Sequence, residues 1–144
     1  MSTEQNKAVV RRFVEEVINK HNPARIDELF TTEYVNYTPG LPPGREAEKQ
    51  LNSVSFAAFP DAHVTIEDLV AEGDKVAARV SYRGTHTGDF TGIPPTGKQF
   101  MVTGMGVFRV ADGKIAEQWS NLDMLSLMQQ LGAIPGMGDR QSVS

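Results

Sequence analysis

The sequence predicts an α+β fold in which a strongly curved antiparallel sheet forms a cone around N-terminal helices. Before Pro60, apolar residues recur at the three- and four-residue spacing of helices. After Pro60, apolar and polar residues alternate, as they do in strands, and short turns separate four long segments of this kind. Long antiparallel strands joined by tight turns must twist, so we expect the sheet to curve around the helix that covers it.

The first half of the chain predicts three helices and one short strand. A helix is expected over residues 3–20, where one apolar stripe is formed by Val9, Val10, Phe13, Val14, Val17 and Ile18. A short helix follows from Pro23 to Phe30, with Asn22 as its N-cap. A strand at 33–37 and a loop at 39–44 lead to a third helix, Arg45–Ala58, which Pro60 ends. The side chains of that helix that are expected to be buried are Leu51, Val54, Phe56 and Phe59.

The second half predicts the long strands and a closing helix. The first strand begins at Val64 and has a bulge at Asp68–Val70, where the alternation breaks. Strands at 76–86, 100–110 and 115–121 follow, and an Asp-Gly turn joins the last two. The closing helix, at 122–131, stops at Gly132. We expect a single domain over residues 1–135 and a flexible tail at 136–144.

Composition narrows the classes of function. The chain has 144 residues, a net charge of −4 and no run of Lys or Arg, which argues against binding to nucleic acid. It has no cysteine, its three histidines lack metal-ligand spacing, and it has no phosphate-binding glycine loop. We therefore expect no metal and no cofactor. Without a signal peptide or an apolar run long enough to span a bilayer, we expect a cytoplasmic protein that does not bind membranes.

Apolar side chains lie on both faces of the predicted sheet. Residues 100–110 carry Met101, Met105 and Val107 on one parity and Phe100, Val102 and Phe108 on the other. A sheet with one face in water alternates apolar with polar residues, so a second apolar face indicates a partner. We expect a homodimer or homotetramer formed through the sheet. The alternative is that the third helix covers this face.

Two titratable residues stand near the ends of predicted strands. His86 shares the parity of Val76 and Tyr82 and precedes the Gly- and Pro-rich loop 87–98, so it could act as an acid or base at a pocket mouth. The alternative is a buried core histidine. Asp123 shares the parity of Trp119 if the strand continues unbroken, and loss of water there would raise the pKa of its carboxyl toward neutrality. The alternative is that Asp123 caps the closing helix.

Other residues could form the walls of the same pocket. Trp119 offers a flat surface for a ring-shaped ligand, or it fills the core. Asn36 and Tyr37 could donate hydrogen bonds to a ligand carbonyl, or they lead into the turn that follows them. Phe13, from the stripe of the first helix, completes the expected lining. Such a pocket predicts a small hydrophobic or aromatic ligand.

Three runs of the sequence resemble those of the SnoaL-like polyketide cyclases, also called ester cyclases, of the NTF2-like superfamily. The runs are GTHTGDFTGIPPTGK (84–98), VFRVADGKIAEQWSNLD (107–123) and LMQQLGAIP (127–135), and the likeness covers about residues 5–135. The resemblance implies an NTF2-like (cystatin-like) cone and the intramolecular aldol cyclisation of a polyketide ester without metal or cofactor. It implies that Asp123 is the acid/base residue, that His86 and Trp119 belong to the pocket, and that Asn36 faces the ligand. Tyr37 stands where many relatives carry His, and a phenol is not a base near neutral pH.

Three other functions are alternatives to the cyclase. An epoxide hydrolase on this fold would need a carboxylate two residues from Arg79 or Arg83, and an isomerase would need an aspartate near 33–37; the sequence has neither. A non-catalytic protein that binds small molecules would have the same pocket walls as an enzyme.

Overall fold

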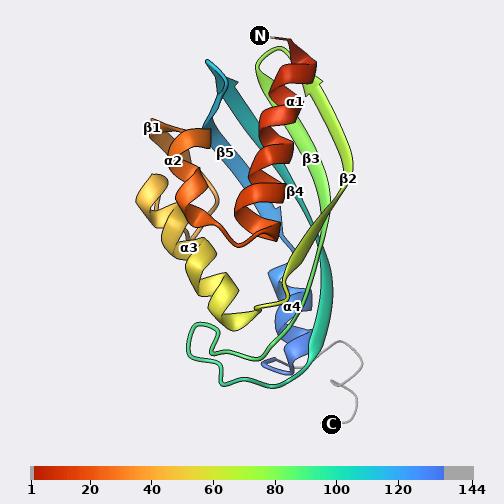
Figure 1. Cartoon of the computed structure of the whole chain (residues 1–144). Helices are drawn as coiled ribbons and strands as arrows, with labels where there is room; N and C mark the ends of the chain where they lie inside the picture. The colour runs from red at the N-terminus through yellow and green to blue at the C-terminus, as the bar shows by residue number, and fades with distance from the viewer. Residues whose placement is uncertain (1, 135–144) are drawn as a thin grey trace.

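The computed structural model describes residues 2–134 and consists of helices packed on one face of a five-stranded sheet (Figure 1). The elements in chain order are α1 (Thr3–Arg12), the π-helix η1 (Phe13–Asn19), the 3-10 helix η2 (Pro23–Arg25), α2 (Ile26–Leu29), β1 (Phe30–Asn36), α3 (Arg45–Ala58), β2 (His63–Glu72), β3 (Lys75–Thr85), β4 (Gln99–Ala111), β5 (Lys114–Leu122) and α4 (Met124–Leu131). The predicted α+β class with a curved sheet is confirmed. The predicted tail at 136–144 lies outside the described residues. Among the helices of residues 2–134, none has both the length and the apolar character needed to cross a membrane.

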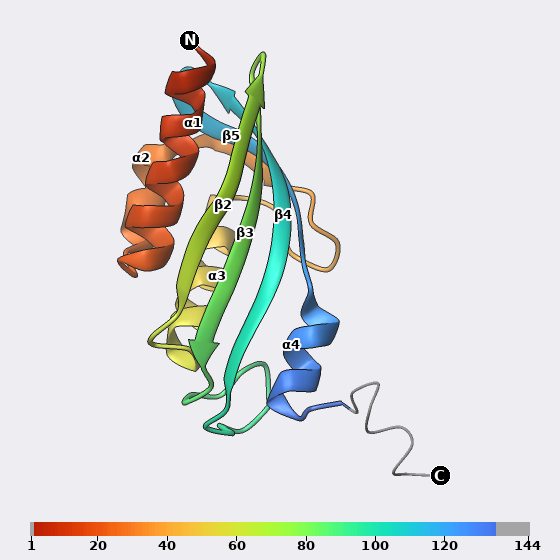
Figure 2. The same cartoon turned by 90° about the vertical axis from the view of Figure 1, so that its right-hand side faces the viewer.

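The sheet has the order β1-β5-β4-β3-β2, and its long strands bend along their length (Figure 2). Strands β2 to β5 pair antiparallel, as predicted, whereas β1 pairs parallel with β5 at one edge. The bulge in β2 lies one residue earlier than predicted. There, Ile66 and Asp68 pair with consecutive residues of β3, so Glu67 is the extra residue.

The first helix changes type along its length. Its start is a capping box, in which Ser2 Oγ accepts a hydrogen bond from the Gln5 backbone N–H and Ser2 N–H donates to the Gln5 side chain. From Phe13 the chain widens into the π-helix η1, so the single α-helix predicted over 3–20 is in fact two helices. The wider turn buries Phe13, Val14 and Val17 against the sheet.

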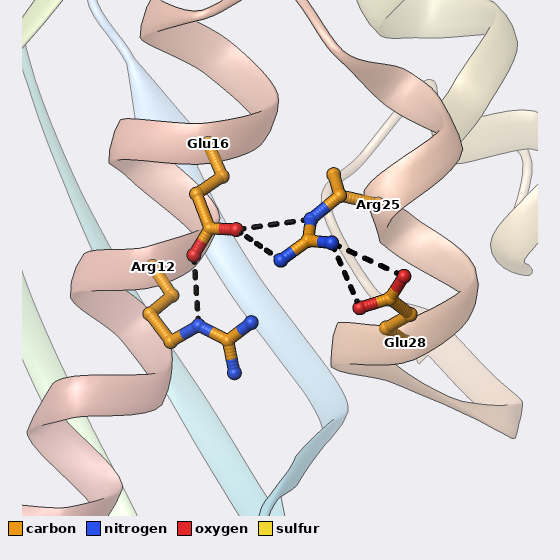
Figure 3. A network of polar contacts seen from close by, with 4 residues as sticks. All are labelled: Arg12, Glu16, Arg25 and Glu28. Atoms are coloured by element: carbon orange, nitrogen blue, oxygen red, sulfur yellow. Dashed lines mark hydrogen bonds and ion pairs between the residues drawn. The ribbon is translucent and has the colours of Figure 1, made fainter.

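Charged side chains join η1 to the next two elements (Figure 3). Glu16 accepts hydrogen bonds from Arg12 Nε at 2.8 Å and from Arg25 Nε at 2.9 Å, and Arg25 also pairs with Glu28 at 3.1 Å. The hydrogen bonds from the two arginines hold the pKa of the Glu16 carboxyl below its ordinary value, and the bond from Arg12 has the larger effect. This network fixes where the chain turns back after η1, although exposure to solvent limits its strength.

The last helix, α4, follows β5 directly and packs beside β4 (Figure 2). Strand β5 ends at Leu122 and leaves Met101 without a partner strand on that side of β4, although β3 pairs with it on the other side. The side-chain amide of Gln130 takes that place, accepting from Met101 N and donating to Met101 O. Leu127 and Leu131 are buried beneath it. These contacts fix the second half of α4 against the start of β4.

The face of the sheet opposite α1, α2 and α3 is left uncovered by the described chain (Figure 2). It exposes Val70, Met101, Met105 and Trp119. The alternative that the third helix covers this face is wrong, because α3 packs against β1 and α2 on the other side. A partner copy on this face stays a prediction.

We predict that Met105→Glu shifts the protein toward monomers, because the new charge would lose its water in a contact between sheets. Size-exclusion chromatography with light scattering measures the mass of the particle. Ser53→Glu, on the exposed side of α3, is the control and should leave the mass unchanged. Trp119 is the only tryptophan and is 38% exposed, so its emission should shift to the red as an assembly dissociates. A monomeric wild type at micromolar concentration would contradict the prediction.

Candidate functional site

A cavity of about 540 Å³ lies between α3, η1 and the concave face of the sheet. This volume is within the range of small-molecule sites. The cavity is lined by residues of two packed clusters of the core, one containing Phe13 and Phe108 and the other containing Phe59, and Tyr82 packs against both. Exposed lining residues mark its mouth: Pro39, Leu51, Val54, Thr91 and Met124. The cavity is therefore an interruption of the hydrophobic core that opens to solvent on one side.

Small residues on three neighbouring strands make room for this cavity. Ala78, Gly106 and Ser120 lie side by side across β3, β4 and β5. A Cβ atom on Gly106 would stand 2.6 Å from Ser120 Oγ, so the row has no space for a larger side chain at this position. Phe108, two residues along β4, fills the same face of the sheet and marks where the solid core resumes. The cavity therefore exists because the side chains in this row of the sheet are small.

A cluster of polar side chains lies at one end of the apolar cavity. Asn36 Nδ2 donates to Glu48 Oε2 at 3.1 Å, and Tyr34 Oη lies 3.3 Å from the same oxygen. Tyr34 donates to Gln118 Oε1 at 2.7 Å, and Gln118 Nε2 donates to Ser120 Oγ at 2.7 Å. The chain of contacts thus runs from α3 through β1 to β5. It gives the cavity one polar end and one apolar end.

Glu48 is the only carboxyl group among the described residues that line the cavity. Glu48 is 5% exposed. Burial raises the pKa of its carboxyl, while the hydrogen bonds from Asn36 and Tyr34 oppose that rise. Burial also raises the pKa of Tyr82, on the opposite wall, to about 12, so this phenol stays protonated near neutral pH. Within residues 2–134, no three His, Asp or Glu side chains gather closely enough to hold a metal ion.

Two of the predicted site residues line the cavity. Phe13 is buried and makes edge-to-face contacts with Phe30 and Phe108, with ring centroids 5.0 and 6.1 Å apart. Asn36 is buried at the polar end, where its Oδ1 accepts from Thr38 N at 2.9 Å. That bond fixes which side of the Asn36 amide faces Glu48.

Trp119 and Tyr37 lie on the outer face of the sheet, away from the cavity. Their rings stack with centroids 5.2 Å apart. The prediction for Trp119 as a pocket wall placed it on the same face as Ile115, but a bulge at Ala116 in β5 reverses the alternation between them. Tyr37, which was expected to donate a hydrogen bond to a ligand carbonyl, follows the last residue of β1 and packs on Trp119 instead. Val110 pairs with Ile115, whereas the neighbouring Arg109 pairs with Glu117. Beyond the bulge, Gln118 and Ser120 face the cavity and Trp119 faces outward.

Asp123 is exposed and caps α4. Its Oδ1 accepts a hydrogen bond from Ser126 N at 3.0 Å, and it is not among the cavity-lining residues. The strand ends at Leu122, so the carboxyl does not lie in a dry site under Trp119, and that predicted placement is wrong. A catalytic role for Asp123 stays a prediction that no contact tests.

His86 is fully buried at the base of the loop 87–98 rather than at the cavity wall. Its Nδ1 lies 2.9 Å from Thr96 Oγ1 and accepts from Thr96 N at 3.3 Å, which leaves the ring proton on Nε2 when the ring is neutral. His86 Nε2 is buried without a hydrogen-bond partner. The position fits the alternative of a core histidine, and it anchors a loop from which Phe90 reaches the cavity.

The residues of the polar end were missed because the buried face of α3 was predicted from the apolar side chains of that helix alone. Glu48, Asn52 and Ser55 repeat at helical spacing and line the cavity. Leu51 and Val54, expected in the core, are 37% and 44% exposed because they line its open mouth. A polar stripe at positions i, i+4 and i+7 was the signal available in the sequence.

Comparisons with known proteins agree with this geometry. The family model described as SnoaL-like polyketide cyclase matches residues 8–131. The aklanonic acid methyl ester cyclase DnrD of Streptomyces peucetius is 28% identical over 129 residues, which cover 86% of this chain and 88% of that protein. The nogalonic acid methyl ester cyclase of Streptomyces nogalater is 30% identical over 111 residues, covering 74% of this chain and 83% of that one.

Solved structures extend the likeness to three dimensions. The structure of TsrD from Streptomyces laurentii superposes with a TM-score of 0.84 at 30% identity, covering 93% of this chain and 99% of that chain. IdmH from Streptomyces antibioticus superposes with a TM-score of 0.79 at 35% identity, covering 89% of this chain and 99% of that chain. The fold and most of its length are therefore shared with both.

We predict that Glu48→Gln stabilises the protein at pH 8 and that the gain disappears near pH 5. Because burial raises the pKa of Glu48 above its ordinary value of 4.5, the folded state binds the proton more tightly than the unfolded state. The wild type therefore loses stability as pH rises from 4.5 through the folded pKa, and glutamine removes that loss. Thermal melts of both proteins at the two pH values measure the effect. An equal difference at both pH values would contradict it.

We predict different effects for two substitutions at the cap of α4. Asp123→Ala should lower the free energy of unfolding by about 1 kcal/mol, because Ser126 N–H loses its acceptor. Asp123→Asn should stay close to the wild type, since asparagine is an equally good N-cap. Urea unfolding followed by circular dichroism measures both. Equal losses for the two variants would show that Asp123 stabilises the fold by something other than capping.

Proposed function

This chain belongs to the SnoaL-like polyketide cyclase family, and we propose that it closes a ring in a polyketide-like ester by cofactor-independent intramolecular aldol condensation. The proposal rests above all on the cavity, which has apolar walls and one buried carboxyl at its polar end. Two relatives are named as cyclases of the methyl esters of aklanonic and nogalonic acid. An ester of that type is the substrate class that we propose for this chain.

The proposed reaction asks little of the protein beyond proton transfer and orientation. A carbon between two carbonyl groups is already acidic, and a carboxylate is a strong enough base to remove its proton. The carbanion then attacks a ketone in the same molecule, and the new alkoxide takes a proton. Holding the two carbons together in a largely apolar cavity adds the contribution of orientation.

The walls support binding of a planar, multi-ring ester. The rings of Phe13, Phe59 and Phe108 and the phenol of Tyr82 line the cavity and offer aromatic surface to the ligand rings. At the polar end, the amide of Gln118 and the hydroxyl of Ser120 offer hydrogen bonds to carbonyl oxygens. The ligand is therefore expected to place its reacting carbonyl groups beside Glu48.

The acid/base role that the resemblance implies for Asp123, with His86 as a pocket residue, receives no support from contacts. Neither residue lines the cavity. A non-catalytic binding protein would present the same walls, and only turnover distinguishes it from a cyclase.

We predict that the protein converts aklanonic acid methyl ester or nogalonic acid methyl ester into a ring-closed isomer of unchanged mass, also after treatment with EDTA. Liquid chromatography with mass detection follows the shift in retention. Gly106→Val should abolish turnover, because its side chain occupies the cavity beside Ser120. Thr103→Val, on the outer side of the same strand, is the matched control.

Two results would contradict the proposal. Calorimetric binding of both esters without ring closure would identify a binding protein. Full turnover by Gly106→Val with an intact fold would show that the reaction takes place outside this cavity.

A further inference from the structure

We infer that Glu48 is the residue that carries the proton in the ring closure, an inference that rests on the function proposed above. The sequence resemblance attaches this role to Asp123, whose carboxylate is exposed and caps a helix. Glu48 instead projects from α3 into the polar end of the cavity and lines it directly. It is 5% exposed and faces the cavity in which an ester would bind.

One oxygen of Glu48 is held by the protein and the other is open to a ligand. Oε2 contacts Asn36 Nδ2 and Tyr34 Oη. Oε1 makes no hydrogen bond within the described chain. Among the described residues, only Asn6, Thr31 and His86 have a side-chain polar atom that is both fully buried and unpaired. Because Glu48 is not one of them, its unpaired Oε1 must be reachable from the cavity that Glu48 lines. A carboxyl fixed at one oxygen and free at the other is arranged to exchange a proton with a bound molecule.

The neighbours of Glu48 suit a carboxyl that holds a proton. Tyr34 has one hydroxyl hydrogen, and its shorter contact, 2.7 Å, is to Gln118 Oε1. The same hydrogen can turn toward Glu48 Oε2, 3.3 Å away, when Glu48 is ionised. When Glu48 carries a proton on Oε1, Oε2 still accepts from Asn36 and the Tyr34 hydrogen stays with Gln118. The neighbours of Oε2 therefore suit both forms of the carboxyl.

The proposed step balances without an added reagent. The Glu48 carboxylate removes a proton from the carbon between two carbonyl groups, and the C–H electron pair delocalises into the enolate. That carbon forms a C–C bond to the ketone carbon, whose π electrons move to oxygen. Glu48 then returns the proton to this alkoxide, so the carboxylate is regenerated and the product is an isomer of the substrate. A pKa raised toward neutrality by burial suits both transfers.

Glu48→Gln tests the inference, because glutamine keeps the size and the hydrogen bonds of the side chain and cannot carry the proton. For aklanonic acid methyl ester, kcat should fall by at least about 100-fold while the calorimetric Kd changes by less than about threefold. Glu46→Gln removes the same charge from an exposed position on the same helix and should act like the wild type. Circular dichroism and thermal melts check that each variant is folded.

A second measurement keeps proton transfer separate from ring closure. Ethyl benzoylacetate has the acidic carbon but no further ketone to attack, and its hydrogen–deuterium exchange in D₂O is followed by NMR above the buffer background. The wild type should accelerate this exchange and Glu48→Gln should not. Exchange that depends on Glu48 without closure of either methyl ester would support Glu48 and reject the proposed cyclisation.

Three outcomes would overturn the inference about Glu48. Glu48→Gln could close the ring at more than about a third of the wild-type rate, a loss far below that expected for a general acid–base group. Asp123→Asn could abolish turnover while Glu48→Gln does not, which would return the role to Asp123. Finally, the wild type could accelerate neither ring closure nor exchange, which would reject both the inference and the proposed function.

Discussion

The central constraint in this structure is the space left by small side chains in the middle of the sheet. Where Ala78, Gly106 and Ser120 lie side by side, the small side chains of the sheet leave space below the helices, and the buried core residues fall into two clusters that share Tyr82. Glu48 faces that space from α3. Its burial, the rise in its pKa and its access to a ligand all depend on the same missing volume, since a filled core would exclude either the carboxyl or the substrate.

The sequence predicted the fold well because periodicity and turn residues act locally. The change of period at Pro60, the Asp-Gly turn at 112–113 and the helix stop at Gly132 all correspond to observed boundaries. The parallel pairing of β1 with β5 was not predicted, because a long-range partner leaves no mark in the spacing of seven residues. The π-helical turn after Phe13 was missed for a related reason, since it keeps nearly the same apolar stripe as an α-helix.

The site was harder to predict because one extra residue in a strand moves every later side chain to the other face. Ala116 is that residue in β5, and it places Trp119 outside and Gln118 inside. Phe13 was found because it belongs to the apolar stripe of the first helix, and Asn36 because it lies on a short strand just before a loop. Glu48 was missed because a single carboxyl on a helix is usually exposed, and only the neighbours supplied by β1 and β5 make it a buried one.

A group that carries a proton must be tolerated by its surroundings in both of its forms. When Glu48 is neutral, the hydroxyl hydrogen of Tyr34 remains with Gln118 Oε1 at 2.7 Å. When Glu48 is ionised, rotation of the Tyr34 hydroxyl hydrogen turns it into a second donor to Oε2, beside the Asn36 amide. Because the phenol hydrogen can point either way, the two protonation states differ by one proton and the rotation of one bond. The arrangement around Glu48 therefore accommodates both of the states that proton transfer requires.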